Sequence, residues 1–318
     1  MTLLNISKIG KQIENNWVVK DVSFTQTRYQ KIVVAGETGS GKSTLLKMIG
    51  GLVQPDAGSI LFDNKNVDGP DEKLVAGHSS IAYLSQHFEL PKFLRVEQVL
   101  RYVNSLSNKE ANSIYTICQI NHLLQRKTDQ LSGGEKQRIA IARLLISKPK
   151  LLLLDEPFSN LDMVLKDILK SVIDNIMEKL RITCMLVSHD PADSLSWADE
   201  ILVMKEGKVI QSGSPEEIYR NPINEYVAGL FGTYNVLTPT MLKFLKVSPK
   251  KAKRIVRPEE MSIKKLKTKS KTSGKVTDIH FLGSHYEIEV MYNKKRFIVA
   301  SMKNSFQIDD FVVFTLSK

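Results

Sequence analysis

The sequence of 318 residues lacks a long uninterrupted apolar run. No stretch reaches about 18 apolar residues, the length that a membrane-spanning helix requires. Residues 1–12, MTLLNISKIGKQ, also lack the long apolar core and the small-residue cleavage site of a signal peptide. We therefore predict a first strand at the start of the sequence and no transmembrane helix.

Cysteine is scarce, since the chain has only two, Cys118 and Cys184. Cys118 lies in an apolar pattern of helical period, and Cys184 lies in the strand-like run TCMLV. This usage is not that of a disulfide-stabilised scaffold. We predict two buried, unreactive thiols in a reducing compartment.

Acidic residues are rare in one segment, residues 241–272. This segment holds twelve basic residues and two acidic ones, and therefore has a net charge of +10 in a chain whose net charge is +11. The rest of the chain is nearly neutral, which argues against a nucleic-acid-binding face across the whole protein. The segment is typical of a solvated linker and domain edge, although a local patch could still contact anionic lipid or RNA.

Short apolar runs such as IVVAG, SIAYLSQ and TCMLVSHD alternate with longer segments of helical period. Strands that alternate with helices indicate an α/β domain with a mostly parallel sheet. Residues 151–154, LLLL, are apolar on both faces, as in a central parallel strand. We predict this α/β domain for residues 1–235.

The pattern changes beyond residue 231. Short alternating runs such as GKVTDIHFLG, HYEIEVMYN and KRFIVAS are separated by glycine, asparagine and aspartate turns. This spacing predicts a small antiparallel β-barrel or sandwich. We place the domain boundary near residue 235, which leaves residues 236–318 for a small all-β domain.

Residues 36–44, GETGSGKST, fit the phosphate-loop pattern G-x-x-x-x-G-K-[ST] between a strand-like KIVVA and a helix-like TLLKMIG. Glycines let backbone N–H groups converge on phosphate oxygens, and the helix adds its positive N-terminal end. Lys42 is expected to reach the β- and γ-phosphates, and Ser43 to bind Mg²⁺. The predicted nucleotide contacts in this loop are Gly36, Glu37, Thr38, Gly39, Ser40, Gly41, Lys42, Ser43 and Thr44.

An acidic pair, Asp155 and Glu156, follows the apolar run of residues 151–154. Asp155 would hold the metal ion through water, and Glu156 would polarise the attacking water. The alternative is that an acidic residue here only caps the next helix. After a phosphate loop, the catalytic interpretation is favoured.

A second helix start, LSGGEKQRIAIAR at residues 131–143, distinguishes this chain from other phosphate-loop proteins. Ser132 is a good N-cap, and Glu135 completes a capping-box pattern. Gly133 and Gly134 leave backbone N–H groups exposed at a second anion-binding helix terminus. One nucleotide does not need both termini from one chain. We therefore predict a dimer in which these residues close over the partner's γ-phosphate.

The run LSGGEKQR resembles the signature of the ATP-binding cassette family. In that family's order, Gln86 of YLSQ matches the glutamine loop, Asp162 of SNLD matches a loop that contacts the partner subunit, and His189 of LVSHD matches the switch histidine. The resemblance implies the phosphate-loop NTPase fold with a helical subdomain at about residues 88–148. It also implies that ATP and Mg²⁺ are bound, that Gln86 touches the metal, and that His189 bonds the γ-phosphate.

The adenine contact has three alternative interpretations. The family usually stacks an aromatic residue on adenine roughly 30 residues before the loop lysine, a position that falls near Ile13 here. The nearest aromatic residue is Trp17. Trp17 could reach the base, aliphatic packing could replace the stack, or Trp17 could simply pack on its own strand.

Residues 199–236 are similar to bacterial solute-importer ATPases, and the run VRPEEMSI followed by GKVTDIHFLGSHYEIEV resembles their C-terminal oligonucleotide-binding-like regulatory (TOBE) domain. The resemblance implies a homodimer or heterodimer of ATPase subunits at the cytoplasmic face of a bacterial inner membrane. It also implies two integral membrane permease subunits or domains, an extracytoplasmic solute-binding protein acting indirectly, and no nucleic acid. The solute implied is ferric iron or a polyamine. An exporter ATPase and a cassette protein that acts on ribosomes or DNA are the alternatives.

The permease would dock beside the glutamine loop. Residues 86–100, QHFELPKFLRVEQVL, carry closely spaced apolar side chains there. We predict a docking groove lined by Phe88, Leu90, Phe93 and Leu94, with Arg95 and Glu97 on its rim. The alternative is that these residues form ordinary core of the helical subdomain.

Overall fold

The computed structural model describes residues 1–86, 89–159, 161–244, 254–270 and 273–316. The chain divides into two compact units, Met1–Pro215 and Glu216–Lys318. The division between the two units, after Pro215, falls earlier in the chain than the predicted domain boundary near residue 235. That boundary stays a prediction. Among the described residues, no helix has the length and apolarity that a membrane span requires.

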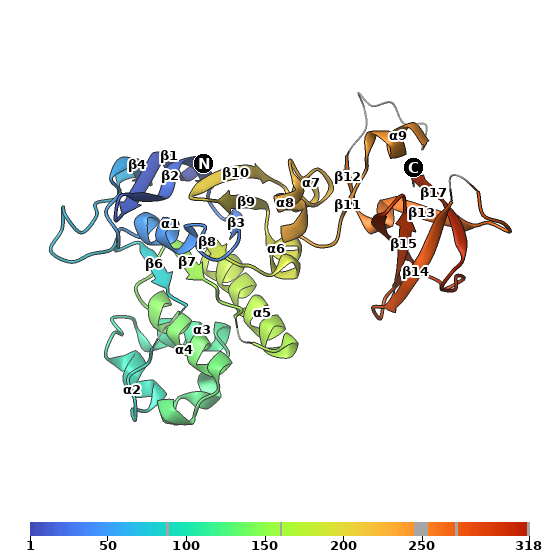
Figure 1. Ribbon diagram of the computed structural model, residues 1–318. Helices are drawn as coiled ribbons and strands as arrows, with labels where there is room; N and C mark the ends of the chain where they lie inside the picture. Colours follow the sequence, from blue (N-terminus) through green and yellow to red (C-terminus); the bar gives the residue numbers. More distant parts are fainter. Residues whose placement is uncertain (87–88, 160, 245–253, 271–272, 317–318) are drawn as a thin grey trace. The chain divides into compact units, whose positions relative to one another are not determined.

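The N-terminal unit contains two sheets (Figure 1). The first is antiparallel with the order β2-β1-β4-β5. Its strands are β1 (Thr2–Ile13), β2 (Asn16–Thr27), β4 (Ala57–Phe62) and β5 (Lys65–Asn66). The second has the order β10-β9-β3-β8-β7-β6. Its strands are β3 (Lys31–Ala35), β6 (Ile81–Leu84), β7 (Leu151–Asp155), β8 (Thr183–Val187), β9 (Glu200–Lys205) and β10 (Lys208–Gly213).

The second sheet is parallel from β9 to β6, and only β10 runs antiparallel to its neighbour. The α/β prediction is therefore confirmed. Every residue of β7 and β8 is buried, which is why these runs are apolar on both faces. Because parallel strands end at the same edge, the segments that follow β3, β7 and β8 meet there.

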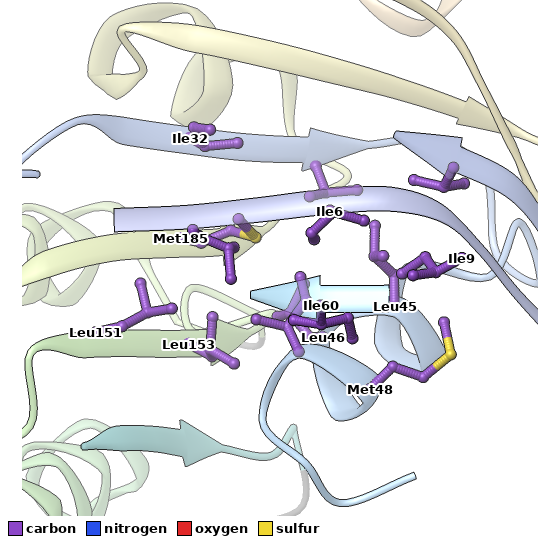
Figure 2. Packing of buried hydrophobic residues seen from close by; sticks show 14 of the residues in the cluster. Ile6, Ile9, Ile32, Leu45, Leu46, Met48, Ile60, Leu151, Leu153 and Met185 are labelled. Atoms are coloured by element: carbon purple, nitrogen blue, oxygen red, sulfur yellow. The ribbon is translucent and has the colours of Figure 1, made fainter. Parts of the chain in front are cut away.

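Helix α1 (Lys42–Ile49) packs between the two sheets. Figure 2 shows its apolar side chains beside residues of β1 and β4 and beside residues of the parallel strands. Leu45, Leu46 and Met48 are fully buried. Burial of each such side chain contributes about 1.5–3 kcal/mol, so this core holds the phosphate loop at the helix start.

Three helices lie in sequence between β6 and β7 and gather at one end of the unit in Figure 1. They are α2 (Val96–Arg101), α3 (Asn108–Ile117) and α4 (Gly133–Leu145), with the 3₁₀ turns Asn121–Leu123 and Thr128–Gln130. The remaining helices of this unit are α5 (Met163–Leu180) and α6 (Pro191–Trp197). Both cysteines are free and buried, and burial raises the pKa of the Cys118 thiol to about 12. The prediction that both thiols are buried is confirmed.

The C-terminal unit is built around an antiparallel sheet with the order β13-β17-β14-β15-β16. Its strands are β13 (Met261–Lys265), β14 (Gly274–Phe281), β15 (Tyr286–Tyr292), β16 (Lys295–Ser301) and β17 (Phe311–Leu316). The smaller elements are α7 (Pro215–Arg220), α8 (Glu225–Leu230), β11 (Asn235–Val236), α9 (Pro239–Phe244), β12 (Ile255–Val256) and the 3₁₀ turn Pro258–Glu260. The prediction of a small antiparallel β structure is confirmed, although helix α9 lies within the region predicted to be all-β.

Arg257 explains why the segment with α7 and α8 groups with the C-terminal unit. Its side chain is 1% exposed and stacks on the Tyr219 ring, with 4.1 Å between the guanidinium carbon and the ring centroid. It donates hydrogen bonds to backbone carbonyl oxygens of Tyr219, Ala228, Gly232 and Thr233. A buried guanidinium needs such acceptors, so these contacts tie residues 219–233 to the strand region.

Candidate nucleotide-binding site

The phosphate loop follows β3 and opens α1, as the motif requires. Gly41 is the N-cap of α1 and has a φ of 97°, in the left-handed region. A Cβ at this position would collide with the carbonyl oxygen of Val18 in β2, so both the backbone angle and the close packing demand glycine. No side chain caps this helix start, which leaves its first N–H groups for a ligand.

Lys42 is buried within the loop. Its ammonium donates hydrogen bonds to the carbonyl oxygens of Gly36, at 2.8 Å, and Glu37, at 2.7 Å. Burial lowers the pKa of Lys42, although the carboxylates of Glu156, Asp155 and Glu37 oppose this shift. The loop therefore curls around a cation that is poorly hydrated, which favours binding of a phosphate group.

Asp155 ends β7 and lies beside the phosphate loop. The Ser43 hydroxyl donates to its Oδ1 at 3.0 Å, and the Tyr83 hydroxyl donates to its Oδ2 at 2.8 Å. Mg²⁺ commonly binds through one or two carboxylates together with substrate phosphates. The hydroxyl of Ser43 and the carboxylate of Asp155 fit that donor set, and their role as metal ligands stays a prediction.

Tyr83 was missed by the sequence analysis. Burial, and then the neighbouring Asp155 carboxylate, raise the pKa of its hydroxyl, which therefore remains a hydrogen-bond donor. The register of β6 on β7 pairs Tyr83 with Leu153 and so brings the hydroxyl to Asp155. No local sequence signal marks this residue, because the contact depends on strand pairing.

The side chains of three predicted site residues, Gln86, Glu156 and His189, lie close together. Oε2 of Glu156 accepts a hydrogen bond from Nε2 of Gln86 at 3.1 Å and lies 3.3 Å from Nδ1 of His189. The backbone of Glu156 has a φ of 50°, in the left-handed region, which is uncommon for a residue with a side chain. Its N–H donates to the carbonyl of Val187 at 3.2 Å, which helps to hold this strained backbone.

The signature residues form the capping box that the sequence predicts. The Ser132 N–H donates to Oε2 of Glu135 at 2.8 Å, and the Glu135 N–H donates to the Ser132 hydroxyl at 3.3 Å. Arg126 lies 3.5 Å from the Glu135 carboxylate. These contacts all lie within residues 126–135 of one segment.

Asp162 has a local structural contact as well as its predicted place in the dimer loop. It is the N-cap of α5, and its Oδ1 accepts a hydrogen bond from the Leu165 N–H at 2.9 Å. Its neighbour in the predicted loop, Asn160, lies outside the described residues.

The two candidate regions for the adenine contact lie at the β1–β2 hairpin. Ile13 is 51% exposed, and Trp17 is 39% exposed. The Trp17 ring lies against Gly10, so it packs partly on its own sheet. It also precedes Val18, the residue that contacts the phosphate loop, so both roles proposed for Trp17 are compatible with its position.

A cavity of about 490 Å³ lies between β6 and α4, beside the Gln86 segment. Its lining residues are Tyr83, Leu84, Ser85, Glu89, Leu90, Val103, Ala140, Arg143, Leu144, Ile146 and Ser147. Of the predicted docking residues, Leu90 lines this cavity, and Phe93 is 72% exposed. Phe88 lies outside the described residues.

Arg95 and Glu97 are the residues predicted to lie on the rim of the docking groove. Both side chains are exposed, and both hydrogen bond to Gln125. Leu94 is half-buried, and its carbonyl accepts from the Thr128 N–H at 2.9 Å. These contacts connect the start of α2 to the turns that lead into α4.

The fold and the site together define a class of protein, the phosphate-loop ATPases. Comparisons with known proteins identify the family. The family described as ABC transporter matches residues 19–159, and the TOBE domain matches residues 255–313. The chain is 33% identical to the spermidine/putrescine import ATP-binding protein PotA of Clostridium acetobutylicum, over 95% of this chain and 91% of that protein.

Two further comparisons agree. The chain is 36% identical to the sulfate/thiosulfate import ATP-binding protein CysA of Synechococcus elongatus, over 74% of this chain and 69% of that protein. A dimeric ATP-binding cassette in a post-hydrolysis state, bound to ADP and Pi, is 25% identical with a TM-score of 0.57, over 67% of this chain and 99% of that one. The chain belongs to the ATP-binding cassette transporter family, as an ATPase with a C-terminal TOBE domain.

Proposed function

We propose that this chain is the ATP-hydrolysing subunit of a bacterial importer and that the imported solute is a polyamine. The observation that carries the proposal is the 33% identity to a spermidine/putrescine import ATP-binding protein across 95% of the chain. Relatives from Mycoplasma mycoides and Clostridioides difficile with the same described function match 96% and 95% of the chain. The polyamine assignment is favoured over ferric iron on this ground.

The hydrolytic site uses groups that the fold brings to one edge of the parallel sheet. Lys42 and the loop N–H groups hold the β- and γ-phosphates. Ser43, Asp155 and Gln86 would hold Mg²⁺, which neutralises charge on the phosphates when bound. Glu156 accepts a proton from the attacking water, and His189 donates a hydrogen bond to the γ-phosphate.

The signature residues act in a second copy of the chain or a related subunit. Ser132, Gly133, Gly134 and Glu135 start a helix whose free N–H groups favour an anion. The hydrogen bonds between Ser132 and Glu135 stay within their own segment, which supports a site that is completed across a dimer. The similar cassette solved as a dimer supports the same arrangement. Hydrolysis removes the γ-phosphate contacts and so releases the interface.

The permease subunits dock beside the Gln86 segment. The cavity at β6 and α4 is large enough for side chains of a partner helix, and Leu90 gives it apolar surface. Phe93, in the same segment of the chain, is 72% exposed and offers a further apolar side chain to a partner. This docking places the chain at the cytoplasmic face of the membrane, and the solute-binding protein acts from the other side. The proposal includes no nucleic-acid partner.

Glu156→Gln tests the hydrolytic assignment, because it keeps the shape of the side chain and removes the base. We expect ATP hydrolysis to fall by about 100-fold or more, the usual contribution of a general base. ATP should still bind, and an ATP-loaded dimer should accumulate, as measured by phosphate release and sedimentation velocity. Glu178→Gln, at an exposed position in α5, is the matched control. A variant that stays monomeric at saturating ATP would contradict the dimer, and unchanged hydrolysis would contradict the role of Glu156.

The solute is tested with the transport complex that co-purifies with the full-length chain, reconstituted in vesicles. Spermidine or putrescine uptake that requires ATP and is lost with Glu156→Gln supports the proposal. Uptake of sulfate or ferric iron alone would assign another solute. Co-sedimentation with ribosomes or DNA that survives moderate salt, without any permease, would contradict the importer assignment.

A further inference from the structure

A group of charged side chains links helix α5 to the segment that carries His189. The Lys166 ammonium lies 2.6 Å from Oδ2 of Asp190 and 3.4 Å from Oδ2 of Asp193. Lys170, one turn further along α5, lies 2.8 Å from Oδ1 of Asp193. Asp193 is 2% exposed, so its carboxylate needs both cations, whereas Asp190 is held by Lys166.

Lys166 also connects to the predicted dimer loop through its backbone. Its N–H donates to the carbonyl oxygen of Asp162 at 2.9 Å. Its side chain contacts Asp190, the residue after His189, and His189 lies 3.3 Å from the Glu156 carboxylate. Lys166, Glu156 and His189 line one small cavity of about 120 Å³. A continuous series of contacts therefore runs from Asp162 through Lys166 to Glu156.

The segment around Asp190 is fixed by further contacts. The Asp190 N–H donates to the Ser188 hydroxyl at 3.1 Å, and its Oδ1 caps α6 by accepting from the Ala192 N–H at 2.9 Å. The hydrogen bond to Asp190 raises the pKa of Lys166, so this cation is charged at neutral pH. In this setting a displacement of Asp190 moves the backbone that carries His189.

We propose that Lys166 is a positioning residue for ATP hydrolysis: through its bond to Asp190 it sets the imidazole of His189 relative to Glu156, and through its backbone it links this geometry to Asp162. This inference rests on the proposed roles of Glu156 and His189. Lys166 touches no reacting atom and acts through Asp190. Misplacement of a catalytic group by about 1 Å is enough to reduce a rate by as much as 100-fold.

The test compares variants of the full-length chain in ATP hydrolysis, nucleotide affinity and thermal unfolding. Lys166→Met removes the charge and keeps the aliphatic stem. We expect kcat to fall by about tenfold while the affinity for ATP stays within about twofold, because ordering of the site is lost and the phosphate contacts remain. Lys166→Arg restores the ion pair and should recover most of kcat. Lys170→Met is the matched control, since it leaves the Lys166–Asp190 contact in place.

A double-mutant cycle separates positioning from general stability. Asp190→Asn removes the charge but retains a side chain that can cap α6. If Lys166 acts through Asp190, the double variant has the same kcat as either single variant, whereas independent effects multiply. Unchanged kcat in Lys166→Met, multiplied losses, or an equal loss in Lys170→Met would each overturn the inference. If the wild-type chain and Glu156→Gln hydrolyse ATP equally, the proposed function itself fails, and this outcome is distinct from the others.

Discussion

The starts of helices α1 and α4 both present backbone N–H groups to an anion, but they are built in different ways. The α1 start is capped by Gly41, has no side-chain cap, and encloses the buried Lys42. The α4 start is capped by Ser132 and Glu135 of its own segment. Among the described residues, nothing lies within 4 Å of a Cβ added at Gly133, whereas a Cβ at Gly41 meets the β2 backbone.

This difference indicates whether each helix start holds a phosphate with residues of its own chain or together with a second chain. The α1 loop is shaped by the rest of its own unit, so in the proposed site one chain supplies the whole of this loop and its lysine. The α4 start is exposed at Ser132 and Gly133 and carries no lysine of its own within the capping box. The α4 start can therefore add hydrogen bonds to a phosphate that a phosphate loop already holds. We expect this of the residues that one chain contributes to the nucleotide site of its partner.

The largest expected effect comes from Lys42→Ala. Removal of a buried cation that faces phosphate is expected to weaken ATP binding by roughly 100-fold, because a charged hydrogen bond contributes about 1.5–3 kcal/mol. Titration with a fluorescent ATP analogue measures this change. Lys47→Ala, at an exposed position on the same helix, is the control and should bind as the wild type does. If Lys42→Ala kept its affinity for ATP, the α1 start would not differ from the α4 start in using a buried lysine to hold phosphate.

The next effect compares two glycines. Gly41→Ala should lower the free energy of unfolding by about 2–3 kcal/mol, because the left-handed backbone and the clash with Val18 both oppose a Cβ. Gly133→Ala should change it by less than about 0.5 kcal/mol, since the site is open. Urea unfolding of both variants measures the difference. Equal destabilisation would show that the α4 start is as tightly enclosed as the α1 loop.

A smaller effect is expected for Ser132→Ala. Loss of the cap should cost about 1 kcal/mol of stability. The same change should weaken ATP-driven dimer formation but leave ATP binding to the monomer unaltered, because the Ser132 hydroxyl bonds within its own segment and is proposed to act on the partner's nucleotide. Ser132→Thr retains a capping hydroxyl and serves as the control. Reduced ATP affinity in monomeric Ser132→Ala would contradict the assignment of this serine to the partner's nucleotide.

The smallest expected effect concerns adenine. If Trp17 stacks on the base, Trp17→Ala should weaken ATP binding by about fivefold, near the lower limit for stacking of a base on an aromatic ring. The Trp17 ring already packs in part on Gly10, which limits how much stacking on adenine can add to the affinity for ATP. Ile13→Ala is the matched comparison. A loss confined to Ile13→Ala would assign the adenine contact to aliphatic packing, and no loss in either variant would exclude this hairpin.

The sequence by itself determined the local features whose physics lies within a few residues. The glycine spacing of residues 36–44 predicts the loop, because only glycine accepts the backbone angle that Gly41 has. The Ser132–Glu135 spacing predicts the capping box that the structure contains. Residues 151–154 are apolar throughout, and that is sufficient to predict a strand buried on both faces.

Only the tertiary structure decided the contacts that join distant segments. Tyr83 reaches Asp155 because β6 pairs with β7, and Arg257 groups residues 219–233 with the C-terminal unit because four carbonyl groups surround it. Lys166 meets Asp190 because α5 packs beside the segment after β8. Such contacts follow from strand order and helix packing, and no local pattern in the chain records them.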